Sequence, residues 1–189
     1  KGALIASIRD NNPVIFVEHR MLYKNAGYVP SESYEIPFGK GRVLKEGKDI
    51  TIVGVSHTVE DALRASDLLK VVGVSAEVID PISLSPLDYA LIRNSANKPK
   101  RLLVIDNGWL TCGFASEIIT DIAINCKNIS CQRIGFAETP CPTTPSLEKY
   151  FYPNPRSIAI EANNMCDGDS KWNPPEVTQD EIVSFKGPF

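Results

Sequence analysis

The stretch that decides the fold runs from residue 101 to residue 118 and reads RLLVIDNGWLTCGFASEI. Its first six residues, apolar at 102–105, are typical of a strand, and the residues from about Gly113 onward carry the apolar stripe of a helix. Gly113 lies where strand gives way to helix, and a glycine there can adopt backbone angles that a side chain would forbid. The stretch therefore predicts a point in an open α/β sheet where a ligand or another subunit comes close.

The same change from strand to helix repeats along the chain. An apolar run at 50–55 precedes a helical pattern over 57–72, in which Val59, Ala62 and Leu63 share one face and after which Gly73 ends the helix. Strands are expected at 14–17, 50–55, 74–79, 101–106 and 129–134, and helices at 1–9, 57–72, from 85 onward, 113–126, 146–151 and 157–165. Strands that alternate with helices predict βαβ units, and hence a parallel sheet covered by helices on both faces.

Some of these elements carry specific expectations. Ser56 is expected to cap the helix over 57–72, and Ser85 to cap the next helix with Pro86 at its first position. Residues 14–17 are all apolar, so we expect a strand that is buried on both faces. The next thirty residues show neither helical nor strand periodicity, which predicts a long ordered loop that contacts another part of the structure or a partner.

Composition indicates an ordinary globular protein. Of the 189 residues, 43% are hydrophobic and 23% charged, and no apolar run reaches the roughly 20 residues that a membrane helix needs. A net charge of −3 offers no basic surface for DNA or RNA, so we expect neither a nucleic acid nor a membrane as partner. The five cysteines are odd in number and form no CxxC pair, which favours a reducing compartment.

The chain is expected to have three parts. Residues 1–12 are interpreted as the end of a preceding domain and a linker, because Asp10, Asn12 and Pro13 stop the first helix. Residues 13–165 are the α/β domain, and residues 166–189 are a tail without an apolar period. The candidates for clamping a neighbouring subunit in that tail are Trp172, Val177, Ile182 and Phe185. The chain starts without an initiator methionine, so we expect a fragment of a longer protein.

Four stretches in order and at the right spacing resemble one family. They are SIRDNNPVI at 7–15 with Glu18, IPFGK at 36–40, EVID at 77–80 followed by LSPLD at 84–88, and GWLTCGFASEI at 108–118. Together they are similar to the C-terminal half of the β subunit of the thiamine-diphosphate-dependent 2-oxo acid dehydrogenases, the E1 component. The resemblance implies a transketolase C-terminal-like domain, with three α/β/α layers around a mostly parallel five-stranded sheet.

The resemblance also implies a function in a larger enzyme. Such an E1 decarboxylates a 2-oxo acid and acylates the lipoyl group of the E2 acyltransferase. The sequence RDNNP at 9–13 favours pyruvate as the 2-oxo acid. In the family, thiamine diphosphate and magnesium are bound outside the matching segment. The segment is therefore expected to serve assembly with the E1 α subunit and a second β subunit and docking of E2, and to be inactive alone.

Other interpretations stay open alongside this one. A branched-chain 2-oxo acid or acetoin dehydrogenase E1 β subunit would carry the same domain, and so would deoxyxylulose-phosphate synthase. A stand-alone, non-catalytic assembly module with the same fold is the interpretation from a different class. The expected location is the cytoplasm in a bacterium and the mitochondrial matrix in a eukaryote.

A potassium ion is the metal that the resemblance implies for this segment. In the family it is held near the junction of the two β-subunit domains, largely by backbone carbonyls, and the matching positions are Ser7, Ile8, Asp10 and Asn12. The last carbonyls of a helix lack hydrogen-bond partners and carry the negative end of its dipole, which suits a hard cation. The alternative is that Asp10 and Asn12 only terminate the helix.

The turn at 108–118 is interpreted as a corner where subunits pack. Trp109 is the expected anchor of this interface, with Cys112, Gly113 and Phe114 beside it. Although Cys112 lies next to a helix start, which can activate a thiol, no base lies near it in sequence. We therefore expect a contact cysteine rather than a nucleophile.

The remaining polar candidates are expected to have structural roles. The two histidines, His19 and His57, are interpreted as an interface or capping residue and as a residue of a helix first turn. Asp80, Asp88 and Asp106 follow strands, and helix capping and turn formation explain them more simply than a pair of catalytic carboxylates.

Overall fold

One five-stranded sheet forms the centre of the fold. The computed structural model describes residues 1–175, and its strands lie in the order β1-β3-β2-β4-β5. Their bounds are β1 Arg42–Lys45, β2 Ile50–Gly54, β3 Ala76–Asp80, β4 Arg101–Trp109 and β5 Ser130–Phe136. Strands β2 to β5 run parallel and β1 pairs antiparallel with β3, so the mostly parallel five-stranded sheet is confirmed.

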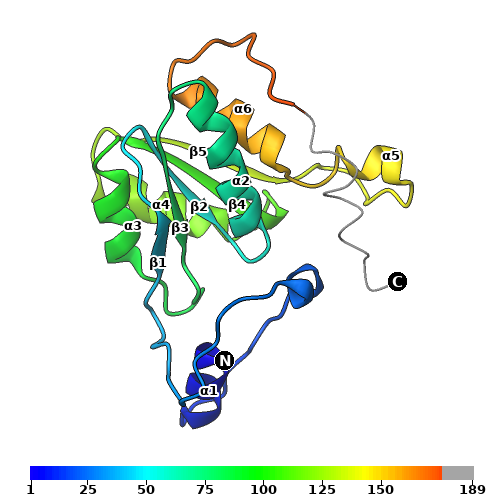
Figure 1. The fold of residues 1–189 in the computed structure, drawn as a ribbon. Coiled ribbons are helices and arrows are strands. Elements are labelled where there is room, and N and C mark those ends of the chain that lie inside the picture. The colour runs from blue at the N-terminus through cyan, green and yellow to red at the C-terminus, as the bar shows by residue number, and fades with distance from the viewer. Residues whose placement is uncertain (176–189) are drawn as a thin grey trace.

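Helices cover both faces of this sheet (Figure 1). One face carries α2 (Thr58–Val71) and α6 (Pro155–Met165), and the other carries α3 (Tyr89–Ala96) and α4 (Ala115–Asn125). Successive residues of a strand point to opposite faces. Accordingly, Leu103 packs with the residues of α2 and α6, and the next residue, Val104, packs with those of α3 and α4. The predicted three-layer α/β/α architecture is confirmed.

The central strands are apolar throughout because both of their faces are buried. Ile52 and Val53 of β2, and Leu103 and Val104 of β4, have no exposed surface. Burying a side chain of this size stabilises the fold by about 1.5–3 kcal/mol relative to leaving it in water. A parallel sheet between two helical layers therefore requires the continuous apolar pattern that the sequence shows at 102–105.

Two helices begin differently from the expectation. The N-cap of α2 is His57 instead of Ser56, and it makes no side-chain capping hydrogen bond. Helix α3 begins at Tyr89, and the carboxylate of Asp88 accepts the N–H of Leu91 at 3.1 Å. An aspartate both satisfies an N–H of the first turn and interacts favourably with the positive end of the helix dipole. It therefore takes the capping position expected for Ser85.

The segment before the sheet departs most from the expectation. Helix α1 (Gly2–Arg9) is present, but residues 14–17 pair with no strand among residues 1–175, and Ile15 is 90% exposed. The prediction of a strand buried on both faces is wrong for these residues. Their sequence is suited to a strand, but the segment lies apart from the sheet (Figure 1), where no neighbouring strand can accept its hydrogen bonds.

The expected long loop contains regular structure of its own. It holds the 3-10 helix η1 (Arg20–Lys24) and the edge strand β1. Strand β1 has only four residues, which alternate between exposed and half-buried, and the ammonium of its Lys45 lies 2.7 Å from the carboxylate of Asp67 on α2. A charged, short strand is typical of a sheet edge.

The last part of the described chain closes the layer of α2 and α6. After the short helix α5 (Pro145–Glu148) and α6, the chain brings Trp172 partly into the cluster beneath α2 and α6. Val177, Ile182 and Phe185, the other candidates for clamping a neighbour, lie outside the described residues. No helix within residues 1–175 is long and apolar enough to cross a membrane.

Candidate functional site

Strand β4 carries the candidate site beyond the edge of the core. Ile105 pairs with Ile134 of β5, and the next pair is Trp109 with Phe136, so β4 advances by more residues than β5 over this step. Such an irregularity bends a strand and redirects its side chains. Strand β4 therefore continues past Asp106, where the strand was expected to end, and Trp109 is its last residue rather than part of a turn.

Asp106 and Gly113 fix the connection from β4 to α4. Asp106 is almost fully buried, and its carboxylate accepts the N–H of Ala115, the first residue of α4, at 2.8 Å. The structural role expected for Asp106 is thereby confirmed. A Cβ atom on Gly113 would lie 2.2 Å from the carbonyl oxygen of Trp109 and 2.7 Å from Oδ2 of Asp106. Contacts within the chain itself thus require a glycine at this position.

Aromatic side chains form a cluster around the end of β4. The Trp109 ring meets Phe136 edge-on at 5.6 Å and Phe151 edge-on at 6.2 Å. Tyr152 extends the cluster through edge-on contacts at 5.1 Å to Phe136 and 4.8 Å to Phe151. Phe151 is buried, whereas Trp109 is 50% exposed. The buried Phe151 and the half-buried Phe136 both contact the indole, and the cluster therefore presents Trp109 to solvent in a defined orientation.

The phenol of this cluster, Tyr152, contacts a cysteine. The hydroxyl of Tyr152 lies 3.3 Å from Sγ of Cys141. That contact, together with partial burial and the charges of Cys141 and Glu148, raises the pKa of Tyr152 to about 12. A phenol with such a pKa stays protonated at neutral pH and is no general base. The cluster is suited to contact rather than to proton transfer.

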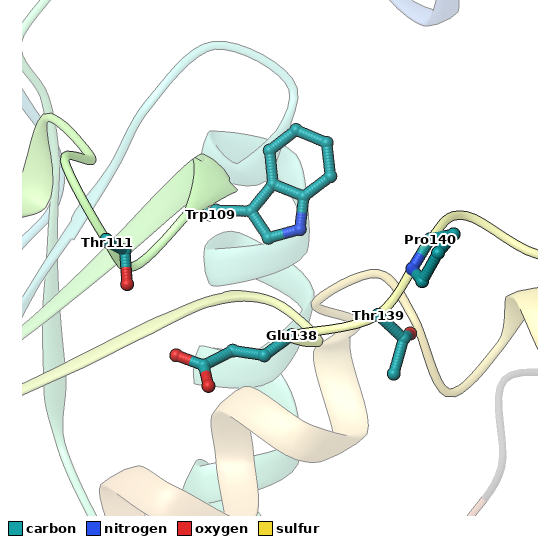
Figure 2. Close-up of a pocket in the computed structure, with 5 residues that line it drawn as sticks. All are labelled: Trp109, Thr111, Glu138, Thr139 and Pro140. Atoms are coloured by element: carbon teal, nitrogen blue, oxygen red, sulfur yellow. The ribbon is translucent and has the colours of Figure 1, made fainter.

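A hollow of about 580 Å³ opens next to Trp109 (Figure 2). Its walls are Trp109 and Thr111, from the end of β4 and the turn that follows, and Glu138, Thr139 and Pro140, from the segment after β5. Figure 2 shows the indole with its ring nitrogen turned toward the segment that carries Glu138 and Thr139, and the Glu138 side chain extended toward Thr111. The carboxyl ends of two neighbouring parallel strands, β4 and β5, therefore form the site.

The four predicted interface residues lie together at this edge. Trp109 and Cys112 are exposed, and Cys112 adopts a positive φ of 58° in the turn. Phe114 precedes α4 and packs in part against the core beneath α3 and α4, so only part of its ring is available for a partner. Gly113 is explained by contacts within the chain. An interface role for these residues stays a prediction.

The predicted potassium ligands lie at the carboxyl end of α1. The N–H of Asp10 bonds to the carbonyl of Ala6, and the carbonyls of Ser7 and Ile8 follow in the last turn, where helix carbonyls lack an intrahelical partner. The Asp10 carboxylate accepts the backbone N–H of Asn12 at 2.7 Å and its side-chain amide at 2.9 Å, which holds the pKa of Asp10 below its ordinary value. The oxygen donors suit a hard cation, and the same bonds also end the helix. Both interpretations stay open.

The two histidines meet beside the start of α2. Their ring centroids are 5.3 Å apart, and Nδ1 of His57 lies 3.4 Å from the carboxylate of Asp61. Nδ1 of His19 accepts the N–H of Met21 and caps η1, as expected for a capping residue. Burial and the neighbouring His57 lower the pKa of His19, and the charge of Asp61 opposes them. The pair joins η1 to α2 and is no nucleophile–base arrangement.

The second wall of the hollow was not predicted from the sequence. Glu138 and the rings Phe136 and Phe151 were not among the candidates, because they lie at or after the end of β5 and not at the end of β4. A usable signal was present: parallel strands end at one edge of a sheet, so the residues after 129–134 had to lie near those after 101–106. The proline-rich run at 139–145 marks the same place in the sequence.

Comparison with known families agrees with this architecture. Residues 39–158 match the family described as "Transketolase, C-terminal domain", and this match covers more than half of the chain. The chain therefore belongs to the transketolase C-terminal domain family. A solved structure described as "Split gene transketolase, inactive beta4 tetramer" matches 70% of this chain and 44% of its own length, with a TM-score of 0.64 and 28% identity.

Curated relatives narrow the family further. The acetoin:2,6-dichlorophenolindophenol oxidoreductase subunit beta of Cupriavidus necator is 37% identical over 171 residues, which are 89% of this chain and 51% of that protein. Its namesake in Bacillus subtilis is 40% identical over 161 residues, 84% of this chain and 47% of that protein. The mitochondrial pyruvate dehydrogenase E1 component subunit beta of Pisum sativum is 36% identical over 173 residues, 88% of this chain and 48% of that protein. The resemblance to E1 β subunits is confirmed, and the chain spans about half the length of the curated relatives it matches.

Proposed function

We propose that this chain is part of the β subunit of a thiamine-diphosphate-dependent 2-oxo acid dehydrogenase E1 that acts on pyruvate and acylates the lipoyl group of E2. The observation that carries the proposal is the alignment of 88% of the chain with the pyruvate dehydrogenase E1 β subunit of pea. Thiamine diphosphate, when bound by the full enzyme, supplies the carbanion chemistry, and the protein supplies position and electrostatics.

The role of this chain in that enzyme is in subunit assembly. Among residues 1–175, no three His, Cys, Asp or Glu side chains come together in a way that would hold a metal ion. We assign no catalytic step to these residues. The exposed Trp109 edge instead suits contact with the E1 α subunit, a second β subunit or E2.

The division of the chain follows the same proposal. Residues 1–12 belong to the junction with a preceding domain, where the carbonyls of Ser7 and Ile8 with Asp10 and Asn12 hold potassium. Residues 13–165 are the transketolase C-terminal-like domain, and residues 166–189 are the C-terminal tail. Bacterial and plant mitochondrial proteins both occur among the relatives, so the proposed location is the bacterial cytoplasm or the mitochondrial matrix.

Acetoin is the second candidate substrate. The Bacillus subtilis relative named for acetoin is 40% identical, against 36% for the pea protein named for pyruvate. A difference of this size does not separate two substrates, because few of the residues compared would contact either one. The two candidates therefore need the same enzymatic test.

The test uses the β polypeptide at its natural length. Mixed with the α subunit of a pyruvate-type or an acetoin-type enzyme, it should form a stable α/β assembly of defined mass. With thiamine diphosphate and magnesium, this assembly should reduce 2,6-dichlorophenolindophenol when given pyruvate. Reduction with acetoin alone would favour the second candidate. Failure to associate with either α subunit, or a start codon directly before that of Lys1, would favour the stand-alone assembly module.

A further inference from the structure

The hollow beside Trp109 exists because the chain diverges after a pair of parallel strands. The last pair of the ladder is Trp109 with Phe136. Immediately afterward, the N–H of Ala137 bonds to the carbonyl of Phe151 at 3.0 Å, which draws the segment after β5 toward α5 and α6 and away from the turn after β4. The space that opens between the two segments is built into the fold. The hollow has a volume of about 580 Å³ and is open to solvent.

The walls of the hollow carry a distinctive set of groups. They comprise an indole ring, two threonine hydroxyls, a proline ring and one charged group, the carboxylate of Glu138. Glu138 is exposed, and among the residues whose side chains the structure describes no Lys, Arg or His lies within ion-pair distance of it. In contrast, Arg133 nearby is engaged with the Leu110 carbonyl and the Ser116 hydroxyl. The hollow thus presents negative charge next to an exposed aromatic ring.

We propose that this hollow binds a lysine or arginine side chain from an extended segment of a partner protein. The carboxylate of Glu138 pairs with the cation, and the aromatic ring of Trp109 attracts it through its quadrupole. An acidic side chain would be repelled by Glu138, and an apolar one would remove water from that carboxylate without compensation. The inference rests on the proposed function in one respect, namely that this domain docks onto partner subunits.

The partner is a peptide segment and not a free amine because the surface extends beyond one side chain. A second exposed aromatic ring, Tyr152 at 39%, is joined to Trp109 through the ring contacts of Phe136 and Phe151. Pro140 and the hydroxyls of Thr111 and Thr139 line the hollow itself. These groups suit the backbone on either side of the basic residue, since hydroxyls and the indole N–H can bond to peptide groups.

Nuclear magnetic resonance of the indole N–H groups tests the inference directly. The chain has two tryptophans, and Trp172 packs in part against the cluster beneath α2 and α6, so its signal serves as an internal reference. Trp172→Phe identifies the Trp109 signal. The probes are blocked pentapeptides Ala-Ala-Lys-Ala-Ala and its versions with Gln or Glu in the centre. The lysine peptide should shift the Trp109 signal saturably, while the other two should not.

Variants then assign the charge. Glu138→Gln should weaken binding of the lysine peptide about threefold to fivefold, as expected for an exposed ion pair. Glu46→Gln is the matched control, since it removes the same charge beside β1 at the opposite edge of the sheet and should leave binding unchanged. Equal weakening by both variants, equal binding of the glutamine peptide, tighter binding of the glutamate peptide, or no saturable shift would each overturn the inference.

Its failure can be told apart from failure of the proposed function. If the natural-length β polypeptide assembles with an α subunit and turns over substrate while the lysine peptide fails to bind, only the inference about the hollow is wrong. If the peptide binds as described while no α subunit associates, the proposed function is wrong and the hollow serves a partner of another kind.

Discussion

Substitution of Gly113 by alanine should destabilise the whole domain, although the residue lies in a partly exposed turn. The new Cβ would lie 2.2 Å from the backbone oxygen of Trp109 and 2.7 Å from Oδ2 of Asp106. The first contact is with backbone, so relief requires the turn itself to open. Opening the turn separates the Asp106 carboxylate from the N–H of Ala115, which it now accepts at 2.8 Å while almost fully buried.

The magnitude follows from these two effects. Overpacking at a site that cannot relax lowers the free energy of unfolding by about 1–3 kcal/mol. Loss of a hydrogen bond to a buried charged group lowers it by about 1–3 kcal/mol more. Gly113→Ala should therefore lose about 2–6 kcal/mol, a large part of the roughly 5–15 kcal/mol that stabilises a typical domain.

Urea denaturation followed by far-ultraviolet circular dichroism measures this loss. With a slope typical of a domain of this size, the midpoint should fall by about 1 M or more. Gly27→Ala is the matched control, because a Cβ there meets no atom within 4 Å. Its midpoint should stay close to that of the unmodified chain. Equal midpoints for the two variants would refute the conclusion that contacts within the chain require Gly113.

Three further predictions follow from other sites. Burial and His57 hold the pKa of His19 below the ordinary imidazole value of 6.5, so at lower pH the folded protein binds fewer protons than the unfolded chain. The contribution of His19 to the free energy of unfolding should therefore be constant above pH 6.5 and fall as the pH drops below it. His19→Asn should remove that part of the slope in urea titrations at several pH values. Lys98→Met should lower the free energy of unfolding by about 1–3 kcal/mol, because the buried carboxylate of Glu77 loses the ammonium group that lies 3.3 Å away. Adding Glu77→Gln to this variant should restore most of the lost free energy. The 189-residue chain alone, given pyruvate, thiamine diphosphate and magnesium, should release no carbon dioxide, and turnover by the pure chain would contradict the assembly role.

The core of the fold could be predicted from the sequence because its pattern is local. Consecutive residues such as Leu103 and Val104 face different helical layers, and both must be apolar. The buried strand therefore shows in the sequence as an uninterrupted run of apolar residues. The same holds for α2, whose apolar face recurs at helical spacing. A local pattern suffices wherever both faces of an element are covered.

Elements that depend on distant neighbours could not be predicted in this way. Residues 14–17 have the composition of a buried strand, but a strand also needs partners, and composition does not show whether they are present. Strand β1 shows the converse: its four residues give no clear period, and it forms because the edge of β3 accepts it. The cap of α3 was misplaced for a related reason, since Ser85 and Asp88 are both good capping residues and only the path of the chain selects Asp88.

The candidate site shows how the structure changes the meaning of a correctly chosen residue. Trp109 was identified by its size and position, and Gly113 was thought to let a neighbouring chain come close. The contacts that an added Cβ would meet at Gly113 lie within its own chain, so the glycine fixes the corner, and its interface role stays a prediction. The Trp109 ring packs edge-on against Phe136 and Phe151. Because the Trp109 ring is already fixed, binding of a partner costs this chain little side-chain conformational entropy. Weak individual contacts to Glu138 and the indole can then suffice for recognition.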